Sequence, residues 1–187
     1  MRPKNIGGTT IRVAKVIFGT EVEGPGKRVA IWTQGCSIKC PGCINQELQN
    51  KNGGYDIDVY DLALEIKKSG LTKVTILGGE PLDQAPQLMN LVWAIRTRNP
   101  GIETMLFTGY EEKEAKKILS PLVWHAFDVI ITGPYVCNKP DDRAWIGSSN
   151  QVIHRVSERS KDYTWPKKDG FQLEFSFDES GAYVNGL

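Results

Sequence analysis

Residues 73–81 read KVTILGGEP, an apolar run of strand length that passes directly into two glycines, a glutamate and a proline. A short run rich in Val, Ile and Leu is typical of a strand that is buried on both faces of a parallel sheet. Glycines at the carboxyl end of such a strand allow a ligand to approach the backbone closely. We therefore predict a parallel α/β sheet around this strand, with a ligand-binding turn at its end.

Strand and helix patterns alternate along the chain on both sides of this run. We expect strands at residues 29–33, 103–108 and 127–131, and helices at residues 56–69, 83–99 and 111–119. The first helix has apolar residues at three- and four-residue spacing, can be capped by Asp56 or Asp58, and can end at Gly70. Alternating strands and helices are typical of a parallel α/β sheet.

The pattern changes after residue 136. A polar, turn-rich stretch precedes a short strand expected at residues 152–156, and a polar connection follows at residues 157–170. Residues 171–177 alternate apolar and polar side chains, as a half-exposed antiparallel strand does, and Tyr183 and Val184 would complete it. We expect a C-terminal β hairpin or edge strand. We also expect one domain over residues 1–187, with its core at about 11–156 and a C-terminal extension at 157–187.

Three of the four cysteines lie in one loop, where residues 36–43 read CSIKCPGC directly after the strand expected at residues 29–33. Structural zinc sites and cysteine-bound Fe–S clusters normally take four protein ligands. Cys36, Cys40 and Cys43 therefore indicate a site that is left open for a ligand from outside the protein. If the site is a 4Fe-4S cluster, that ligand can be S-adenosylmethionine (SAM), with which Fe–S proteins perform radical chemistry. The alternative is a structural zinc site completed by Cys137 or His154.

Composition sets limits on the partners and the compartment. The chain has 187 residues, 40% of them hydrophobic, which is enough for one domain with a buried core. Its formal charge of +1, from 23 basic and 22 acidic side chains, favours neither nucleic acid nor an anionic membrane as a partner. Residues 1–8 carry no apolar stretch behind their charges. Because no segment approaches ~20 consecutive apolar residues, we expect a soluble protein of the cytoplasm. The cysteines form no disulfide framework, which fits a reducing compartment.

Several turns are expected to share one pocket. Ligands of α/β proteins bind where the carboxyl ends of parallel strands meet the loops that follow them. The cysteine loop and the turns at residues 78–80, 108–110 and 132–134 all directly follow predicted strands. We therefore expect them to lie at one edge of the sheet.

The cysteine spacing and the GGEP turn, in this order, resemble the radical SAM superfamily. A narrower resemblance rests on EGPGKR at residues 23–28, the cysteine loop with its flanks at 34–45, FTGY at 107–110 and GSSNQ at 147–151. These segments are similar to the activating proteins of anaerobic (class III) ribonucleotide reductases, and the likeness spans about residues 17–154. The resemblance implies a compact partial (β/α) barrel of the radical SAM type and a macromolecular substrate.

The resemblance also implies the chemistry. Cys36, Cys40 and Cys43 would hold three irons, and the methionine amino and carboxylate groups of SAM would bind the fourth. Reductive cleavage of SAM would give a 5′-deoxyadenosyl radical that abstracts hydrogen from a glycine of the reductase large subunit. A flavodoxin-like or ferredoxin-like protein would supply the electron. No general acid or base is expected, and the implied SAM contacts are Gly78, Gly79, Glu80, Pro81, Thr108, Gly109, Tyr110, Thr132, Ser148 and Asn150.

Two features depart from the family pattern or extend it. The family commonly has an arginine before GSSNQ, where this chain has Ile146, and the connection at residues 157–170 is longer than expected for a minimal activating protein. Gly42, before the third cysteine, is instead typical of the activating proteins. These departures keep open an alternative function, a small radical SAM enzyme that modifies a small molecule or peptide.

Overall fold

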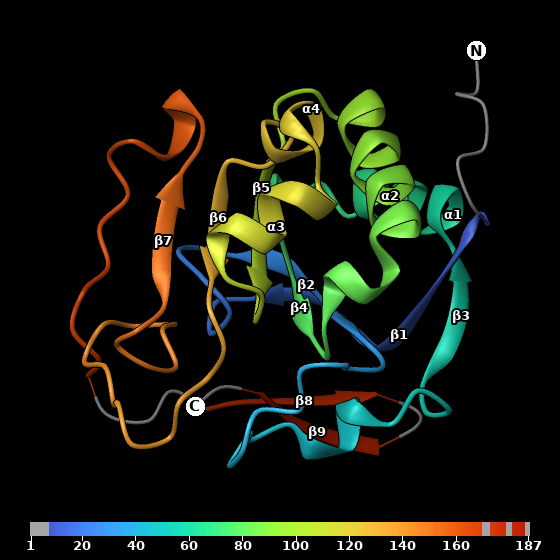
Figure 1. Ribbon diagram of the computed structural model, residues 1–187. Helices are drawn as coiled ribbons and strands as arrows, with labels where there is room; N and C mark the ends of the chain where they lie inside the picture. The colour runs from blue at the N-terminus through green and yellow to red at the C-terminus, as the bar shows by residue number, and fades with distance from the viewer. Residues whose placement is uncertain (1–7, 170–172, 179–180, 186–187) are drawn as a thin grey trace.

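Four parallel strands form the centre of a seven-stranded mixed sheet (Figure 1). The computed structural model describes residues 8–169, 173–178 and 181–185. The strands lie in the order β3-β1-β2-β4-β5-β6-β7. Their bounds are β1 Thr10–Thr20, β2 Arg28–Thr33, β3 Tyr55–Asp58, β4 Lys73–Gly78, β5 Glu103–Thr108, β6 Val129–Thr132 and β7 Val152–Arg155.

The central strands β2, β4, β5 and β6 pair in parallel, whereas β1, β3 and β7 add antiparallel pairs at the two sides. The predicted α/β class is therefore confirmed. Its partial-barrel form stays a prediction. The sequence interpretation missed β1, whose pairing with β2 is irregular between Val13 and Lys15 and again between Phe18 and Thr20. Such irregularities interrupt the strict alternation that identifies a strand in sequence.

The helices are α1 (Val59–Lys68), α2 (Ala85–Arg98), α3 (Glu112–Ile118) and α4 (Pro121–Trp124), and the 3-10 turns are η1 (Gln46–Gln49), η2 (Pro81–Gln84) and η3 (Glu158–Ser160). In Figure 1, α1 and α2 lie side by side over the sheet. Their apolar faces join the strands in the main core, and Leu62, Ile66, Leu88 and Leu91 are all at most 1% exposed. A smaller core contains Met105, Val129, Ile131 and Ile146.

Several predicted boundaries were wrong by a few residues. The first helix begins at Val59 rather than residue 56, because residues 55–58 pair with β1 as the short strand β3. Of the two predicted caps, Asp58 is the one that accepts hydrogen bonds from the backbone N–H groups of Tyr60 and Asp61. Similarly, η2 precedes α2, and the fourth parallel strand begins at Val129 rather than residue 127.

The predicted C-terminal hairpin is confirmed. Strands β8 (Glu174–Asp178) and β9 (Gly181–Asn185) pair with each other as a separate two-stranded sheet. The backbone N–H of Glu21, in the β1–β2 connection, donates to Oε1 of Glu174 over 2.8 Å. Phe171 and Gln172, which belong to the predicted strand, and residues 1–7 lie outside the described residues. No described helix is long and apolar enough to cross a bilayer.

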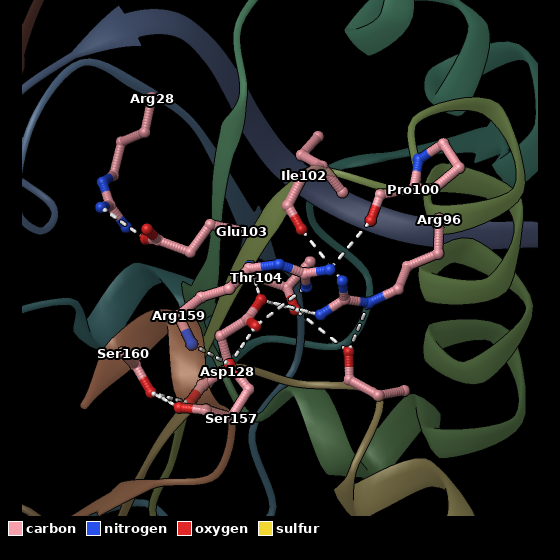
Figure 2. A network of polar contacts seen from close by, with 11 residues as sticks. Arg28, Arg96, Pro100, Ile102, Glu103, Thr104, Asp128, Ser157, Arg159 and Ser160 are labelled. Carbon is pink, nitrogen blue, oxygen red and sulfur yellow. Dashed lines mark hydrogen bonds and ion pairs between the residues drawn. The ribbon is translucent and has the colours of Figure 1, made fainter.

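Buried ion pairs secure the strand ends opposite the predicted site (Figure 2). Arg28, at the start of β2, is fully buried. Its Nη2 lies 3.3 Å from Oε1 of Glu103, at the start of β5. Asp128, just before β6, accepts from Arg96 over 2.7 Å and from the backbone N–H of Thr104 over 2.8 Å. Because both carboxylates have charged partners, this edge of the sheet can bury charge.

Candidate functional site

The cysteine loop and the GGEP turn are joined by backbone hydrogen bonds. Strands β2 and β4 are parallel neighbours, and their pairing continues beyond their ends. The N–H of Gly79 donates to the carbonyl of Thr33, and the N–H of Glu80 donates to the carbonyl of Gly35, each over 2.8 Å. The predicted convergence of these two segments at one sheet edge is therefore confirmed.

Gly79 must be a glycine for this pairing to form. A Cβ added to Gly79 would lie only 2.2 Å from the carbonyl oxygen of Gly35. Any side chain would therefore push the GGEP turn away from the residue that precedes Cys36. The double glycine thus permits close backbone approach, although the approaching group found here is the cysteine loop itself.

Glu80 joins the ends of β4 and β5 from inside the protein. It is only 1% exposed, and Oε1 accepts from the backbone N–H of Leu82 over 2.8 Å and from the Thr108 hydroxyl over 2.7 Å. Its Oε2 accepts from the backbone N–H of Gly109 over 2.8 Å. Burial raises the pKa of Glu80 to about 7, although these three hydrogen bonds favour the ionised form. Both carboxylate oxygens are therefore committed to protein groups.

The three clustered cysteines are half-buried free thiols in one tight loop. The backbone N–H of Cys43 donates to the carbonyl of Cys40 over 3.2 Å, and that of Cys36 donates to the carbonyl of Gln49 over 3.4 Å. Burial raises the pKa of the Cys36 and Cys40 thiols. The fourth cysteine, Cys137, is exposed, and its Cβ would lie 3.1 Å from a Cβ added to Gly42. The segment after β6 therefore packs against the cysteine loop.

The clustered donor set is three cysteine thiols. Thiolates are the ligands that hold 4Fe-4S clusters, with each thiolate bound to its own iron. Among the described residues, no group of three His, Cys, Asp or Glu side chains is arranged to hold one metal ion. His154, the other residue considered for zinc, places Nε2 3.0 Å from the Thr132 hydroxyl and packs edge-on against Trp124.

The GSSNQ loop packs against the segment after β6. Ser148 is fully buried, and its hydroxyl accepts from the backbone N–H of Val136 over 3.1 Å. Asn150 donates from Nδ2 to the carbonyl of Pro134 over 2.8 Å, but its buried Oδ1 has no hydrogen-bond partner among the residues that the structure describes. Since buried polar atoms are normally paired, this oxygen is a candidate contact for a bound ligand. The hydroxyls of Ser148 and Thr132 already have protein partners.

Gln151 fastens this loop, a role that the sequence interpretation missed. Its Oε1 accepts from the backbone N–H groups of Gly147 and Ser148 over 2.9 and 3.2 Å. Its Nε2 donates to the carbonyl of Gly133 over 3.1 Å. The available signal was its place at the end of the GSSNQ run, where the amide of a glutamine can both accept and donate.

Ser37 and Asp83 were also missed, and they connect the cysteine loop to two other loops. Asp83, in η2, accepts from the Ser37 backbone N–H over 2.7 Å and from the Ser37 hydroxyl over 2.6 Å. The Tyr110 hydroxyl donates to the same carboxylate over 3.2 Å. The sequence signal was an acidic residue two positions after Pro81, which we had interpreted only as a helix start.

The predicted site residues thus divide into two groups. The first group lies at or directly after the ends of the adjacent strands β4 and β5 and is linked to the cysteine loop; it consists of Gly78, Gly79, Glu80, Pro81, Thr108, Gly109 and Tyr110. Thr132, Ser148 and Asn150 belong to the neighbouring region around β6 and β7. The contact between Gly42 and Cys137 connects this second region to the cysteine loop.

Comparison with known proteins assigns the family. A family described as a 4Fe-4S single cluster domain matches residues 22–154. The anaerobic ribonucleoside-triphosphate reductase-activating protein of Enterobacteria phage T4 is 37% identical over 137 residues, which cover 71% of this chain and 86% of that relative. The chain belongs to this family of activating proteins.

Other members of the activating-protein family match over a similar length. The anaerobic ribonucleoside-triphosphate reductase-activating proteins of Escherichia coli K12 and Vibrio cholerae are 33% and 32% identical, over 72% and 73% of this chain and 92% of each relative. The 4Fe-4S domain match includes the cysteine loop, the GGEP turn and the GSSNQ loop of this activating-protein family member. The C-terminal hairpin lies outside that match.

Proposed function

We propose that this chain uses a 4Fe-4S cluster to cleave SAM reductively and so generates a glycyl radical on the large subunit of an anaerobic ribonucleotide reductase. The observation that carries this proposal is the backbone pairing of the cysteine loop with the GGEP turn. It joins three free thiols to a ligand-binding type of turn. Relatives named activating proteins of anaerobic ribonucleoside-triphosphate reductase supply the reductase as the partner.

In this proposal Cys36, Cys40 and Cys43 hold three irons and leave the fourth iron for SAM. When bound, the cluster and SAM supply the radical chemistry, and the protein binds, orients and shields them. The cysteine loop can hold its ligands in place because backbone hydrogen bonds fix it to Leu48 and Gln49 on one side and to the GGEP turn on the other. The cysteines must lose their protons before they bind iron, because the thiolate is the ligand.

We propose that SAM contacts both groups of predicted site residues, those at the ends of β4 and β5 and those around β6 and β7. Gly78 and Gly79 are half-buried at the end of β4, and Thr108, Gly109 and Tyr110 shape the end of β5. Glu80 orients these two strand ends, since both of its oxygens accept hydrogen bonds from protein groups. Asn150 offers its buried Oδ1, which is unpaired within the described part of the chain, to the cofactor. Pro81, Thr132 and Ser148 hold the surrounding backbone.

The remaining elements of the proposal concern the fold and the reaction partners. We propose a single domain over residues 1–187 with the sheet shaped as a partial barrel, and an electron donor of the flavodoxin or ferredoxin type. Ile146, which departs from the family pattern, is fully buried against Met105, Val129 and Ile131. It therefore packs beneath the GSSNQ loop and does not itself favour a small-molecule substrate.

The test uses anaerobic reconstitution of the full chain with iron and sulfide, then reduction by dithionite in the presence of SAM. We expect 5′-deoxyadenosine by chromatography and, after addition of the cognate reductase, a glycyl-radical signal by electron paramagnetic resonance. SAM cleavage without a radical on the reductase would favour the small-molecule or peptide alternative. Bound zinc and no SAM cleavage would contradict both functions.

A further inference from the structure

Asp83 is the meeting point of three loops at the carboxyl edge of the sheet. Its carboxylate accepts from the backbone N–H of Ser37 over 2.7 Å, from the Ser37 hydroxyl over 2.6 Å and from the Tyr110 hydroxyl over 3.2 Å. The Ser37 and Tyr110 hydroxyls also lie 3.2 Å apart. Ser37 follows β2, Asp83 follows β4 and Tyr110 follows β5, so one side chain ties together the ends of three strands.

The bond to the Ser37 N–H acts directly on Cys36. This N–H belongs to the planar peptide that joins Cys36 to Ser37, so fixing it restricts the ψ angle of Cys36. On the other side, the N–H of Cys36 itself donates to the carbonyl of Gln49 over 3.4 Å. The backbone of Cys36 is therefore held from both sides, and the backbone sets the directions that its Sγ can take.

Asp83 acts on Cys36 by its charge as well as by its hydrogen bonds: burial raises the pKa of the Cys36 thiol, and the charge of Asp83 acts in the same direction. A carboxylate close to a cysteine opposes ionisation of the thiol, which a metal ligand needs. Asp83 therefore acts against ligand formation by its charge and supports it by its geometry. Only a carboxylate at this position can accept from all three donors, because an asparagine has one acceptor oxygen.

We propose that Asp83 is a positioning residue that holds Cys36, the first cysteine of the loop, in the orientation needed to bind the cluster. The inference rests on the proposed function for the role of Cys36 as a ligand. It extends that function by assigning the acidic residue after the GGEP turn to the cysteine loop rather than to SAM.

The experiment compares wild-type full-length chain with Asp83→Asn and Asp83→Ala, before and after anaerobic reconstitution. Asp162→Asn serves as the matched control, because Asp162 is an exposed aspartate outside the site. Hydrogen exchange followed by mass spectrometry reports on the Ser37 amide, and transfer of iron to a chelator reports on cluster retention. We expect roughly tenfold faster exchange at Ser37 and several-fold faster iron loss in Asp83→Ala, smaller increases in Asp83→Asn, and wild-type values in Asp162→Asn.

The Asp83→Asn variant separates positioning from charge. It removes a negative charge near Cys36 but keeps one acceptor oxygen for the Ser37 N–H, whereas Asp83→Ala removes both the charge and every acceptor. A purely electrostatic role therefore predicts slower iron loss in both variants and unchanged exchange at Ser37 even in Asp83→Ala. That result would overturn the proposal. Asp83 is exposed, which favours folding of the variants, and Tyr110→Phe provides a second test that removes one hydroxyl from the carboxylate. An intermediate rate of iron loss in Tyr110→Phe is expected, and a wild-type rate would contradict the three-loop connection.

The two proposals can fail separately. If wild-type protein retains iron but cleaves no SAM, the proposed function fails, whereas faster Ser37 exchange in the Asp83 variants still supports positioning. If wild-type protein cleaves SAM and the Asp83 variants match it in exchange and iron retention, the positioning role is wrong and the proposed function stands.

Discussion

The hydroxyl of Thr108 donates a 2.7 Å hydrogen bond to Oε1 of Glu80, and this bond joins the ends of two neighbouring parallel strands inside the protein. The same carboxylate also accepts from the backbone N–H groups of Leu82 and Gly109. Glu80 is therefore a structural centre of the candidate site, as well as part of its GGEP turn.

Glu80→Ala should destabilise the protein strongly. Removal of the carboxylate leaves three buried donors unpaired, for which we expect a loss of about 3 kcal/mol in the free energy of unfolding. Chemical denaturation followed by circular dichroism measures this loss. Glu111→Ala is the matched control, since Glu111 is exposed and makes no comparable set of contacts. Equal stability of the two variants would contradict the role given to Glu80.

The free energy of unfolding should depend on pH because Glu80 has a raised pKa in the folded protein. Burial raises its pKa from 4.5 to about 7, so between these values the folded protein binds more protons than the unfolded chain. The contribution that this raised pKa makes to the free energy of unfolding is complete below about pH 4.5 and is lost as the pH rises through 7. Relative to Glu80→Gln, the wild-type free energy of unfolding should fall by about 3 kcal/mol between pH 4.5 and 8.

Glu23 provides an internal control for that measurement. Burial also raises its pKa to about 7, and Glu23 is unchanged in the Glu80→Gln variant. Glu23 should therefore contribute equally to the pH dependence of the free energy of unfolding in both proteins. Only the difference between their two stability curves reports on Glu80. Parallel curves for wild-type and variant would refute a raised pKa at Glu80.

Asp128 should show the opposite dependence on pH. Burial opposes its ionisation, but hydrogen bonds from Ser157 and Thr104 and the charge of Arg96 together lower its pKa below 3.8. Its contribution to stability is present above that value and is lost as the pH falls below it. We expect Asp128→Asn to cost about 3 kcal/mol near pH 7, measured by denaturation. The exposed Glu114→Gln should leave stability unchanged, and a similar loss in both variants would argue against the buried network.

Gly79→Ala should separate the GGEP turn from the cysteine loop. The added Cβ would meet the carbonyl oxygen of Gly35 at 2.2 Å, so we expect a loss of about 2 kcal/mol in stability together with weaker iron retention. Gly101→Ala is the control, because its added Cβ would have its nearest neighbour at 3.9 Å. Thermal unfolding and iron content after reconstitution measure the two effects. Wild-type iron content in Gly79→Ala would contradict the proposed coupling of the two loops.

Cys40→Ala and Cys137→Ala together test the proposed ligand set. Loss of one of three thiolates should abolish cluster retention and SAM cleavage in Cys40→Ala while the sheet remains folded. Cys137→Ala should retain both, since Cys137 contacts the loop at Gly42 but is outside the proposed ligand set. Iron and sulfide analysis, with circular dichroism for folding, provides the comparison. If Cys137→Ala lost iron while Cys40→Ala retained it, Cys137 rather than Cys40 would be the ligand.

Local sequence patterns were sufficient for the central elements of the fold. Apolar runs predicted β4 and β5, and the capping residue Asp58 was among those expected for α1. The hydrophobic pattern did not predict strands that contain charged residues or pair irregularly. Arg12 and Lys15 lie within β1, and residues 55–58 form β3 only because β1 is beside them. A strand that depends on its neighbour has no strong signal of its own.

Consecutive residues specify which groups are available to the site. The spacing of the three cysteines, the double glycine and the GSSNQ run are properties of consecutive residues, so they can be recognised without a structure. Because each motif directly follows a predicted strand, the sequence also indicates that the loops meet at the carboxyl edge of the sheet.

Which of these groups interact depends on the folded chain. Asp83 and Ser37 are separated by 46 positions, and Glu80 and Thr108 by 28, so no local periodicity connects them. Their hydrogen bonds form because β2, β4 and β5 are adjacent and parallel, which places the residues after each strand at the same edge. The chemistry of each side chain is local, but its partner is set by strand order, a property of the folded chain alone.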